Sequence, residues 1–578
     1  TGGGGFAMLA GAPVVYDKQQ EIRQLLVDEV RRRGTIAPSD YFHVNWRVEP
    51  ASAVASLYRQ MRRDVAEATS PAAPPARATS AVAASDTAVV RATRPAPRLR
   101  IIATNDFHGA LEPRTDPSGT NRGGAAYLAT ALTAARAGCI APACETILVD
   151  AGDQFQGTPA SNLAFGRPVV AIFNDLGYAA AAVGNHEFDW GQDTLRARMR
   201  EAHYHMLAAN VRYADGRDVP WIPDDTLVTR GAIKIGIIGV ATIATPTTTR
   251  ASNVADLRFV DPVPIVDSLS RRLRARGADY VVLLAHAGAF CDRDGASNCN
   301  GEIVDVARRL REPVDAIVSG HTHSLVDATV NGIPIVQARS SGTAYAVIDL
   351  AAGGSVHRVP DVLADSLRPD AHVDSMVRVA VARVAPLVNR PVATIARDLV
   401  RTGSEYPLGD LIADAMRSAG HGDIAVINNG GIRTGLRAGQ ATYGSLFEVQ
   451  PFANQLSRVT LTGFALRGYL ERQVATRPNV HVSGLRVTYD TARAAGSRIV
   501  DVRMADGSPL RDEAHYHVIV PDFLATGGAG VLGATPLDTQ ILPIIDLDAL
   551  IAYLQSRPQP VQPPTDLRFI AVAGGGAR

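Results

Sequence analysis

Between residues 99 and 350, short hydrophobic runs alternate with longer segments in which apolar residues recur at helical spacing. Such short, continuous apolar runs are typical of strands that are buried on both faces of a sheet. We therefore predict strands at residues 99–104, 146–150, 179–183, 233–240, 280–285 and 316–319. Their alternation with helical segments predicts a layered α/β fold.

Polar side chains that commonly bind metal ions follow or end five of these six runs. They are Asp106, His108, Asp153, Asn185, His286, His321 and His323. Taken alone, a histidine at a strand end is more often a satisfied polar residue or a cap than a metal ligand. Strand ends can, however, bring ligands to one edge of a sheet. Seven oxygen and nitrogen donors without a thiolate suit a pair of hard or borderline divalent ions. The set therefore predicts metal-assisted hydrolysis.

One of these loops, residues 184–189, carries an amide, an imidazole and two carboxylates within five residues. His186 directly follows Asn185, so we expect it to face a substrate and not the same ion. Asp189, three residues later, can fix the tautomer of His186. We interpret Glu187 and Phe188 as structural support.

The remaining segments predict further domains. Residues 1–68 show helical periodicity to which we assign no role, and residues 69–98 are rich in Pro and Ala, as in a linker. Residues 366–390 have the pattern of a linking helix. A second α/β region follows at 391–578.

Composition narrows the classes of partner. The 578 residues are enough for two or three domains. Because 58 Lys and Arg balance 57 Asp and Glu, we expect no nucleic-acid polymer as partner. No apolar run reaches the roughly 18 to 20 residues that a bilayer-spanning helix needs, so we expect no transmembrane segment.

Two features bear on the compartment. The chain begins at Thr1, so we expect a fragment or processed product whose signal peptide is not visible. The cysteines form two close pairs, Cys139 with Cys144 and Cys291 with Cys299. The spacing is not that of a zinc site. We favour two local disulfides over four free thiols, which implies an oxidising compartment.

Several motifs together resemble a known family. The sequences Asp106-Phe-His108, Gly152-Asp153, Gly184-Asn-His-Glu187, His286 and Gly320-His-Thr-His323 resemble the motifs of the calcineurin-like metallophosphoesterases. The longer forms at 104–109 and 184–189, with Asn428-Asn-Gly-Gly-Ile-Arg433, resemble the 5′-nucleotidase family more narrowly. The resemblance covers residue 99 to the C-terminus.

The resemblance implies a fold and a ligand set. We expect an N-terminal four-layer metallophosphatase sandwich at 99–365, joined by the linking helix to a C-terminal α/β substrate-recognition domain. One ion is expected on Asp106, His108 and His323 and the other on Asn185, His286 and His321, with Asp153 bridging them. In the family a metal-bound water attacks phosphorus, and the residue matching His186 stabilises the phosphoryl oxygens.

The resemblance also implies residues that recognise the substrate. Arg433 is expected to bind the phosphate, as is Arg401, which precedes the helical motif that begins near Gly409. The nucleoside is expected to contact Asn428 and Asn454, with its base between Phe452 and Phe523. The family's ribose-binding Asp is replaced by Ala529, which implies relaxed or redirected recognition of the sugar.

The sequence thus predicts a periplasmic or secreted hydrolase that removes phosphate from nucleotides with two divalent ions, such as Zn²⁺, Mn²⁺ or Mg²⁺. The alternatives are a 2′,3′-cyclic nucleotide phosphodiesterase, a nucleotide-sugar hydrolase or another small phosphate-ester hydrolase. A catalytically silent nucleotide-binding or surface protein would keep the fold, but it would have no need of the complete donor set.

Overall fold

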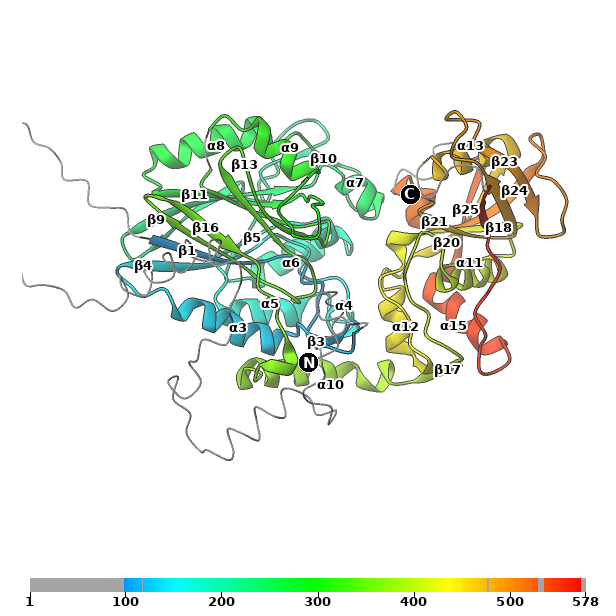
Figure 1. Ribbon diagram of the computed structural model, residues 1–578, viewed down its shortest axis with the longest axis horizontal. Coiled ribbons are helices and arrows are strands. Elements are labelled where there is room, and N and C mark those ends of the chain that lie inside the picture. Colours follow the sequence, from blue (N-terminus) through cyan, green and yellow to red (C-terminus); the bar gives the residue numbers. More distant parts are fainter. Residues whose placement is uncertain (1–97, 117, 313, 476–477, 529–534, 573–578) are drawn as a thin grey trace, which may run out of the picture. The chain divides into compact units, whose positions relative to one another are not determined.

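The computed structural model describes residues 98–116, 118–312, 314–475, 478–528 and 535–572. The predictions for residues 1–97 and for Ala529 lie outside these ranges. Within them, the first structural region is built on two six-stranded sheets, and the predicted α/β layering is confirmed. Figure 1 shows helices on the outer sides of the paired sheets.

The first sheet has mostly parallel strands at its centre. Its order is β16 (Gly354–Arg358), β15 (Ala346–Ala351), β1 (Arg98–Thr104), β4 (Cys144–Asp150), β5 (Ala180–Ala182) and β6 (His205–Leu207). Strands β1, β4, β5 and β6 are mutually parallel, whereas β15 and β16 continue the sheet antiparallel. Consequently β1, β4 and β5 end at the same edge.

The second sheet repeats this plan. Its order is β13 (Leu325–Val330), β14 (Ile333–Ala338), β12 (Ala316–Ser319), β11 (Tyr280–His286), β9 (Ile233–Ala241) and β8 (Asp225–Arg230). The central four strands are parallel, and β13 and β8 pair antiparallel at the two edges. In each sheet three of the six strands match the predicted runs. The others are mainly peripheral strands, several of which are shorter or less continuously buried.

Three apolar layers hold these elements together. Side chains such as Ile101 and Ile237 fill the space between the sheets. The first sheet packs its other face on α3 (Ala125–Ala137), α5 (Arg167–Leu176) and α6 (Gln192–Glu201). The second packs on α8 (Val263–Ala275) and α9 (Glu302–Arg309). The result is the four-layer sandwich that the family resemblance implied.

Short elements and disulfides complete this region. They are the strand pairs β2 (Arg114–Thr115) with β3 (Asn121–Arg122) and β7 (Val211–Tyr213) with β10 (Leu257–Phe259), and the helices α4 (Pro159–Asn162) and α7 (Thr245–Thr248). Cys139 is bonded to Cys144 and Cys291 to Cys299, which confirms both predicted disulfides.

A long helix, α10 (Ala371–Val388), follows and lies within the predicted linking segment. Asp370 caps it by accepting hydrogen bonds from the backbone N–H groups of His372 and Val373. Its buried side chains include Val373 and Val377, and the helix packs against α3, α4 and α5.

The C-terminal region has a five-stranded sheet with the order β21 (Val480–Ser483), β18 (Ile424–Asn428), β24 (His515–Pro521), β20 (Gln455–Thr462) and β25 (Asp538–Ile545). One apolar core joins it to α11 (Pro407–Gly420), α12 (Tyr443–Val449) and α15 (Asp546–Ser556), with the pair β17 (Pro391–Ile395) and β19 (Gly439–Thr442). A second core contains α13 (Gly463–Gln473), α14 (Asp522–Ala525) and the sheet of β22 (Leu485–Tyr489), β23 (Ile499–Met504) and β26 (Phe569–Ala571).

Among the described residues, no helix combines the length and apolar character needed to cross a membrane.

Candidate active site

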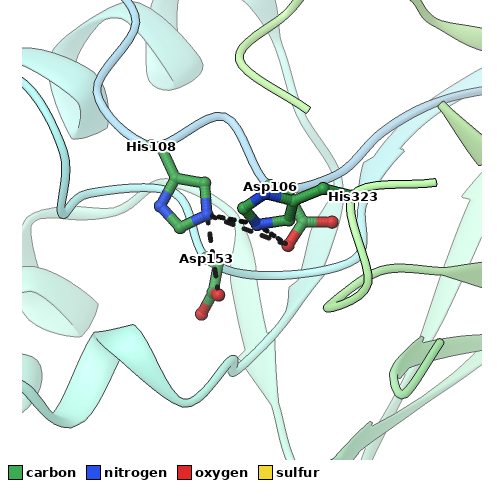
Figure 2. A group of neighbouring side chains, drawn as sticks. All are labelled: Asp106, His108, Asp153 and His323. Atoms are coloured by element: carbon green, nitrogen blue, oxygen red, sulfur yellow. Dashed lines mark hydrogen bonds and ion pairs between the residues drawn. The ribbon is translucent and has the colours of Figure 1, made fainter. Parts of the chain in front are cut away.

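The first cluster of predicted ligands lies where β1, β4 and β12 end. Ligand atoms of Asp106, His108, Asp153 and His323 all lie within 4.8 Å of one another. His108 Nε2 is 2.9 Å from His323 Nε2 and 3.8 Å from Asp153 Oδ2. Figure 2 shows these side chains converging from separate loops. This spacing leaves room for one cation between imidazole and carboxylate donors.

The second cluster shares Asp153 with the first. Ligand atoms of Asp153, His286 and His321 also lie within 4.8 Å of one another. His286 Nε2 is 3.1 Å from Asp153 Oδ2, and Asn185 Oδ1 is 3.1 Å from His286 Nε2 and 2.9 Å from His321 Nδ1. All seven predicted ligands are therefore gathered around one shared carboxylate.

Backbone groups orient several of these side chains. The Nδ1 atoms of His108 and His286 lie 2.7 and 2.8 Å from the carbonyl oxygens of Gln156 and Ala151. A proton on each Nδ1 leaves Nε2 free to face the cluster. The Asn185 amide donates to the carbonyl of Thr248, which turns its oxygen toward the histidines.

The backbone at the ligands is itself unusual. Five of the seven have positive φ: Asp106 (49°), His108 (52°), Asp153 (56°), His321 (79°) and His323 (55°). Non-glycine residues rarely adopt this conformation, and such strain concentrates at functional sites. Gly184 is needed for a different reason, since a Cβ there would collide with the carboxylate of Asp153.

The electrostatics of the clusters favour a cation. Burial alone would raise the pKa of Asp153, but the surrounding histidines, His286 first, hold it well below its ordinary value. Burial opposes the charge on His286 too, yet Asp153 raises its pKa to about 10. Burial lowers the pKa of His321 to about 3 and raises that of Asp106 to about 7. Without a metal, a proton on His286 balances the negative charge of the neighbouring carboxylates. A bound metal ion would balance that charge instead, and His286 would bind it as a neutral imidazole.

The donor set fits divalent metal binding. It consists of carboxylate, amide and imidazole groups, the donors that Zn²⁺, Mn²⁺ and similar ions accept. All but the two histidines after β12 are at most 4% exposed. The Asp and His clusters could therefore hold a metal ion.

The predicted catalytic pair lies beside these clusters. His186 Nδ1 is 2.7 Å from Asp189 Oδ2, and the His186 backbone N–H donates to Asp153. Burial lowers the pKa of His186, but the carboxylates of Asp189 and Asp153 outweigh it and raise the pKa above the ordinary value. Glu187 is buried and accepts from the backbone N–H groups of Asp153, Gln154 and Gly184, as expected for structural support.

A cavity of about 560 Å³ joins these residues to the C-terminal region. Asp153, Asn185, His186, Asp189, His321 and His323 line it together with five of the predicted substrate contacts, which are Asn428, Arg433, Phe452, Asn454 and Phe523. The Phe452 ring stacks on His186 with centroids 5.6 Å apart, and the Arg433 guanidinium lies 5.7 Å from the Phe452 ring centre. Predicted reaction and recognition residues therefore face the same space.

Arg401 is placed differently. It is exposed, donates to the carbonyl of Asn429 and lies outside the set of described residues that line the cavity. Its charge still lowers the pKa of Arg433, although burial is the larger cause.

The cavity also has lining residues that sequence reasoning missed. They are Thr247, Thr248, Thr249, Arg250, Phe290, Thr322, Gly430, Gly431 and Asn479. Thr322, Gly430 and Gly431 lie within quoted motifs but were given no role there. For Thr247, Thr248 and Thr249 the available signal was the threonine-rich run at 245–249, which follows a predicted strand without a metal-ligand motif. Arg250 Nη2 lies 3.6 Å from Asp522 Oδ2, and Asn479 accepts a hydrogen bond from Asn429.

Comparisons with known proteins agree with this geometry. The model of the calcineurin-like phosphoesterases matches residues 99–325, and that of the 5′-nucleotidase C-terminal domain matches residues 384–535. The structure of a 5′-nucleotidase precursor from Thermus thermophilus has a TM-score of 0.71 and 27% identity, and covers 83% of this chain and 100% of that one.

Two relatives illustrate the range of similar proteins. Endonuclease YhcR of Bacillus subtilis is 28% identical over 505 residues, which are 80% of this chain but only 40% of YhcR. The snake venom 5′-nucleotidase of Gloydius brevicauda is 28% identical over 501 residues, which are 75% of this chain and 82% of the relative. With both domain models and the Asp and His clusters in place, the chain belongs to the 5′-nucleotidase family of metal-dependent hydrolases, with a calcineurin-like phosphoesterase domain and a C-terminal 5′-nucleotidase domain.

Proposed function

We propose that this enzyme hydrolyses nucleotide phosphate esters to nucleoside and phosphate, using two divalent ions. The observation that carries the proposal is the single cavity lined by Asp153 and His186 on one side and by Phe452 and Phe523 on the other. Its volume of about 560 Å³ is in the range of small-molecule sites.

The proposed metal ligands divide into two groups that share Asp153. Asp106, His108 and His323 would hold one ion, and Asn185, His286 and His321 the other. When bound, such ions supply Lewis acidity to a phosphoryl oxygen and make water a stronger nucleophile. The donor set suits Zn²⁺, Mn²⁺ or Mg²⁺.

The residues of the chain would act on the phosphoryl group directly. His186, with a raised pKa and its Nδ1 against Asp189, presents Nε2 as a donor to the phosphoryl oxygens as their charge increases. Arg433 Nη2 lies 3.4 Å from His108 Nε2, so the guanidinium is close enough to the cluster to bind the same phosphoryl group.

Recognition of the nucleoside is assigned to the C-terminal domain. Phe452 and Phe523 would hold the base by stacking, which tolerates different bases. Asn428 and Asn454 would donate and accept hydrogen bonds, and the Asn454 amide is already oriented by its hydrogen bond to Asp546. For Arg401 we propose only an electrostatic contribution to phosphate binding.

We also propose the domain bounds and the location of the protein. We propose the domain bounds 99–365 and 391–578, with 366–390 as the linking helix and 1–68 and 69–98 as an N-terminal region and its linker. Two disulfides and a relative from snake venom support a periplasmic or secreted location.

A phosphate-release screen tests the proposal. Nucleoside mono-, di- and triphosphates, 2′,3′-cyclic nucleotides and nucleotide sugars would each be incubated with the metal-loaded and the EDTA-treated chain. We expect fastest release from 5′-nucleotides and loss of release in EDTA, restored by added metal. Because Ala529 replaces a carboxylate, ribose and deoxyribose substrates should differ little. Faster hydrolysis of cyclic nucleotides or nucleotide sugars would favour those alternatives.

A further inference from the structure

Asp189 has a second partner besides His186. While its Oδ2 atom faces His186 Nδ1 at 2.7 Å, its Oδ1 atom accepts a hydrogen bond from Thr249 Oγ1, also at 2.7 Å. Thr249 is only 2% exposed. The three side chains therefore form a continuous chain of short hydrogen bonds that begins behind the candidate catalytic histidine.

The surrounding segment supports the same loop at two other points. The carbonyl of Thr248 accepts from the Asn185 amide, and the Asn253 amide donates to the carbonyls of Phe188 and Asp189, both at 2.9 Å. Residues 248–253 thus contact the side chain of a proposed metal ligand, the carboxylate behind His186 and the backbone between them. These contacts fix the loop relative to the cavity.

Thr249 differs from the threonines before it. The hydroxyls of Thr245, Thr247 and Thr248 donate to the carbonyl oxygens of Thr242 or Ala244, within their own segment. The Thr249 hydroxyl instead donates to Asp189, 60 residues away in the chain. A local turn therefore accounts for the first three hydroxyls but not for the fourth.

The hydrogen bond from Thr249 restricts the rotation of the Asp189 carboxylate. A carboxylate held only by one imidazole can rotate about its χ2 torsion and lose alignment with Nδ1. A hydroxyl donor on the other oxygen removes that freedom and keeps the carboxylate an acceptor. The Nδ1–H group then donates to Asp189, and Nε2, which donates to the substrate when the ring is protonated, faces the cavity in a fixed direction.

We propose that Thr249 is a positioning residue that acts through Asp189 to align His186. The inference rests on the proposed function of His186 and adds Thr249 to the groups that determine the rate of phosphoryl transfer. Although Thr249 lines the cavity, substrate binding should depend on it little, because its hydroxyl is directed to Asp189.

Three variants test the role. Thr249→Val removes the hydroxyl and keeps the shape, Thr249→Ser keeps the hydroxyl, and Thr245→Val removes a buried hydroxyl from the same segment as a matched control. We expect Thr249→Val to lower kcat about 10- to 100-fold with little change in KM, metal content or Tm. Thr249→Ser and Thr245→Val should stay within about threefold of wild-type kcat.

The proposal would be overturned if Thr249→Val had the same kcat as Thr245→Val. It would also be overturned if Thr249→Val and Thr249→Ser lowered kcat by the same factor. Absence of metal-dependent phosphate release from the wild-type chain would instead count against the proposed function. The inference is then tested without turnover by ¹⁵N-histidine NMR of metal-loaded protein. We expect wild-type His186 to be protonated at Nδ1 and Thr249→Val to show altered His186 ring shifts, and identical spectra would overturn the proposal.

Discussion

The two sides of the cavity are built differently. On the metal side, the predicted ligands follow parallel strands and most are almost fully buried, and five adopt a strained backbone conformation. On the C-terminal side, Phe452 and Phe523 are half-buried, and Phe452 lies in a loop. Strand ends in two packed sheets hold ligand positions rigidly, whereas loops can vary. This difference supports the proposed division, in which the metal side and Arg433 carry the reaction and the other C-terminal contacts carry substrate choice.

The largest effect is expected from a residue that belongs to the metal side but is not a proposed ligand. His186→Asn should lower kcat about 10²- to 10³-fold, because a donor to the developing phosphoryl charge is lost. Metal content, measured by elemental analysis, should equal that of the wild type. Loss of bound metal together with activity would mean that His186 supports the clusters and not the reaction.

A smaller effect on KM is expected from the C-terminal side. Stacking on one aromatic face contributes about 1 to 3 kcal/mol, so Phe523→Ala should raise KM for a 5′-nucleotide about 5- to 150-fold. Phe523→Tyr keeps the aromatic face and serves as the control. The KM for a phosphate ester without an aromatic group should not change. Equal increases for both substrates would remove the distinction between the two sides.

The smallest effect concerns stability near Asn454. Burial raises the pKa of Asp546 to about 7, although Asn454 donates to its carboxylate. The folded state therefore binds the proton of the Asp546 carboxyl more tightly than the unfolded state does. The stability that this protonated carboxyl contributes is lost as pH rises from about 4 to about 7. The Tm of the wild type should therefore decrease more between pH 5 and pH 8 than the Tm of Asp546→Asn does.

Asp548→Asn is the control for this pH dependence, because Asp548 is exposed in the same helical turn. A Tm difference between wild type and Asp546→Asn that is the same at both pH values would contradict the titration of Asp546.

Much of the fold and of the metal side was predictable because short continuous stretches of sequence indicate both. The predicted strand at 280–285 corresponds to β11 (Tyr280–His286), and the linking segment at 366–390 contains α10 (Ala371–Val388). Continuous apolar runs mark buried parallel strands, and ligands at their ends share an edge. Edge strands such as β13 were missed, since alternating burial gives a weaker pattern.

The rest depended on contacts between distant segments. The approach of Thr249 to Asp189 is determined by packing of the loop after β9 and leaves no motif in the sequence. The resemblance predicts Arg401 at the phosphate, and in the structure its exposed guanidinium donates to the carbonyl of Asn429. Such positions follow from loop conformation, which local sequence patterns determine poorly.

The most direct test of the central claim is a metal titration of the EDTA-treated chain, with bound ions per chain and phosphate release from a 5′-nucleotide measured on the same samples. The shared position of Asp153 predicts that release stays low with one ion bound and recovers as the second binds. Full release from the metal-free chain, or full recovery at one ion per chain, would contradict the account.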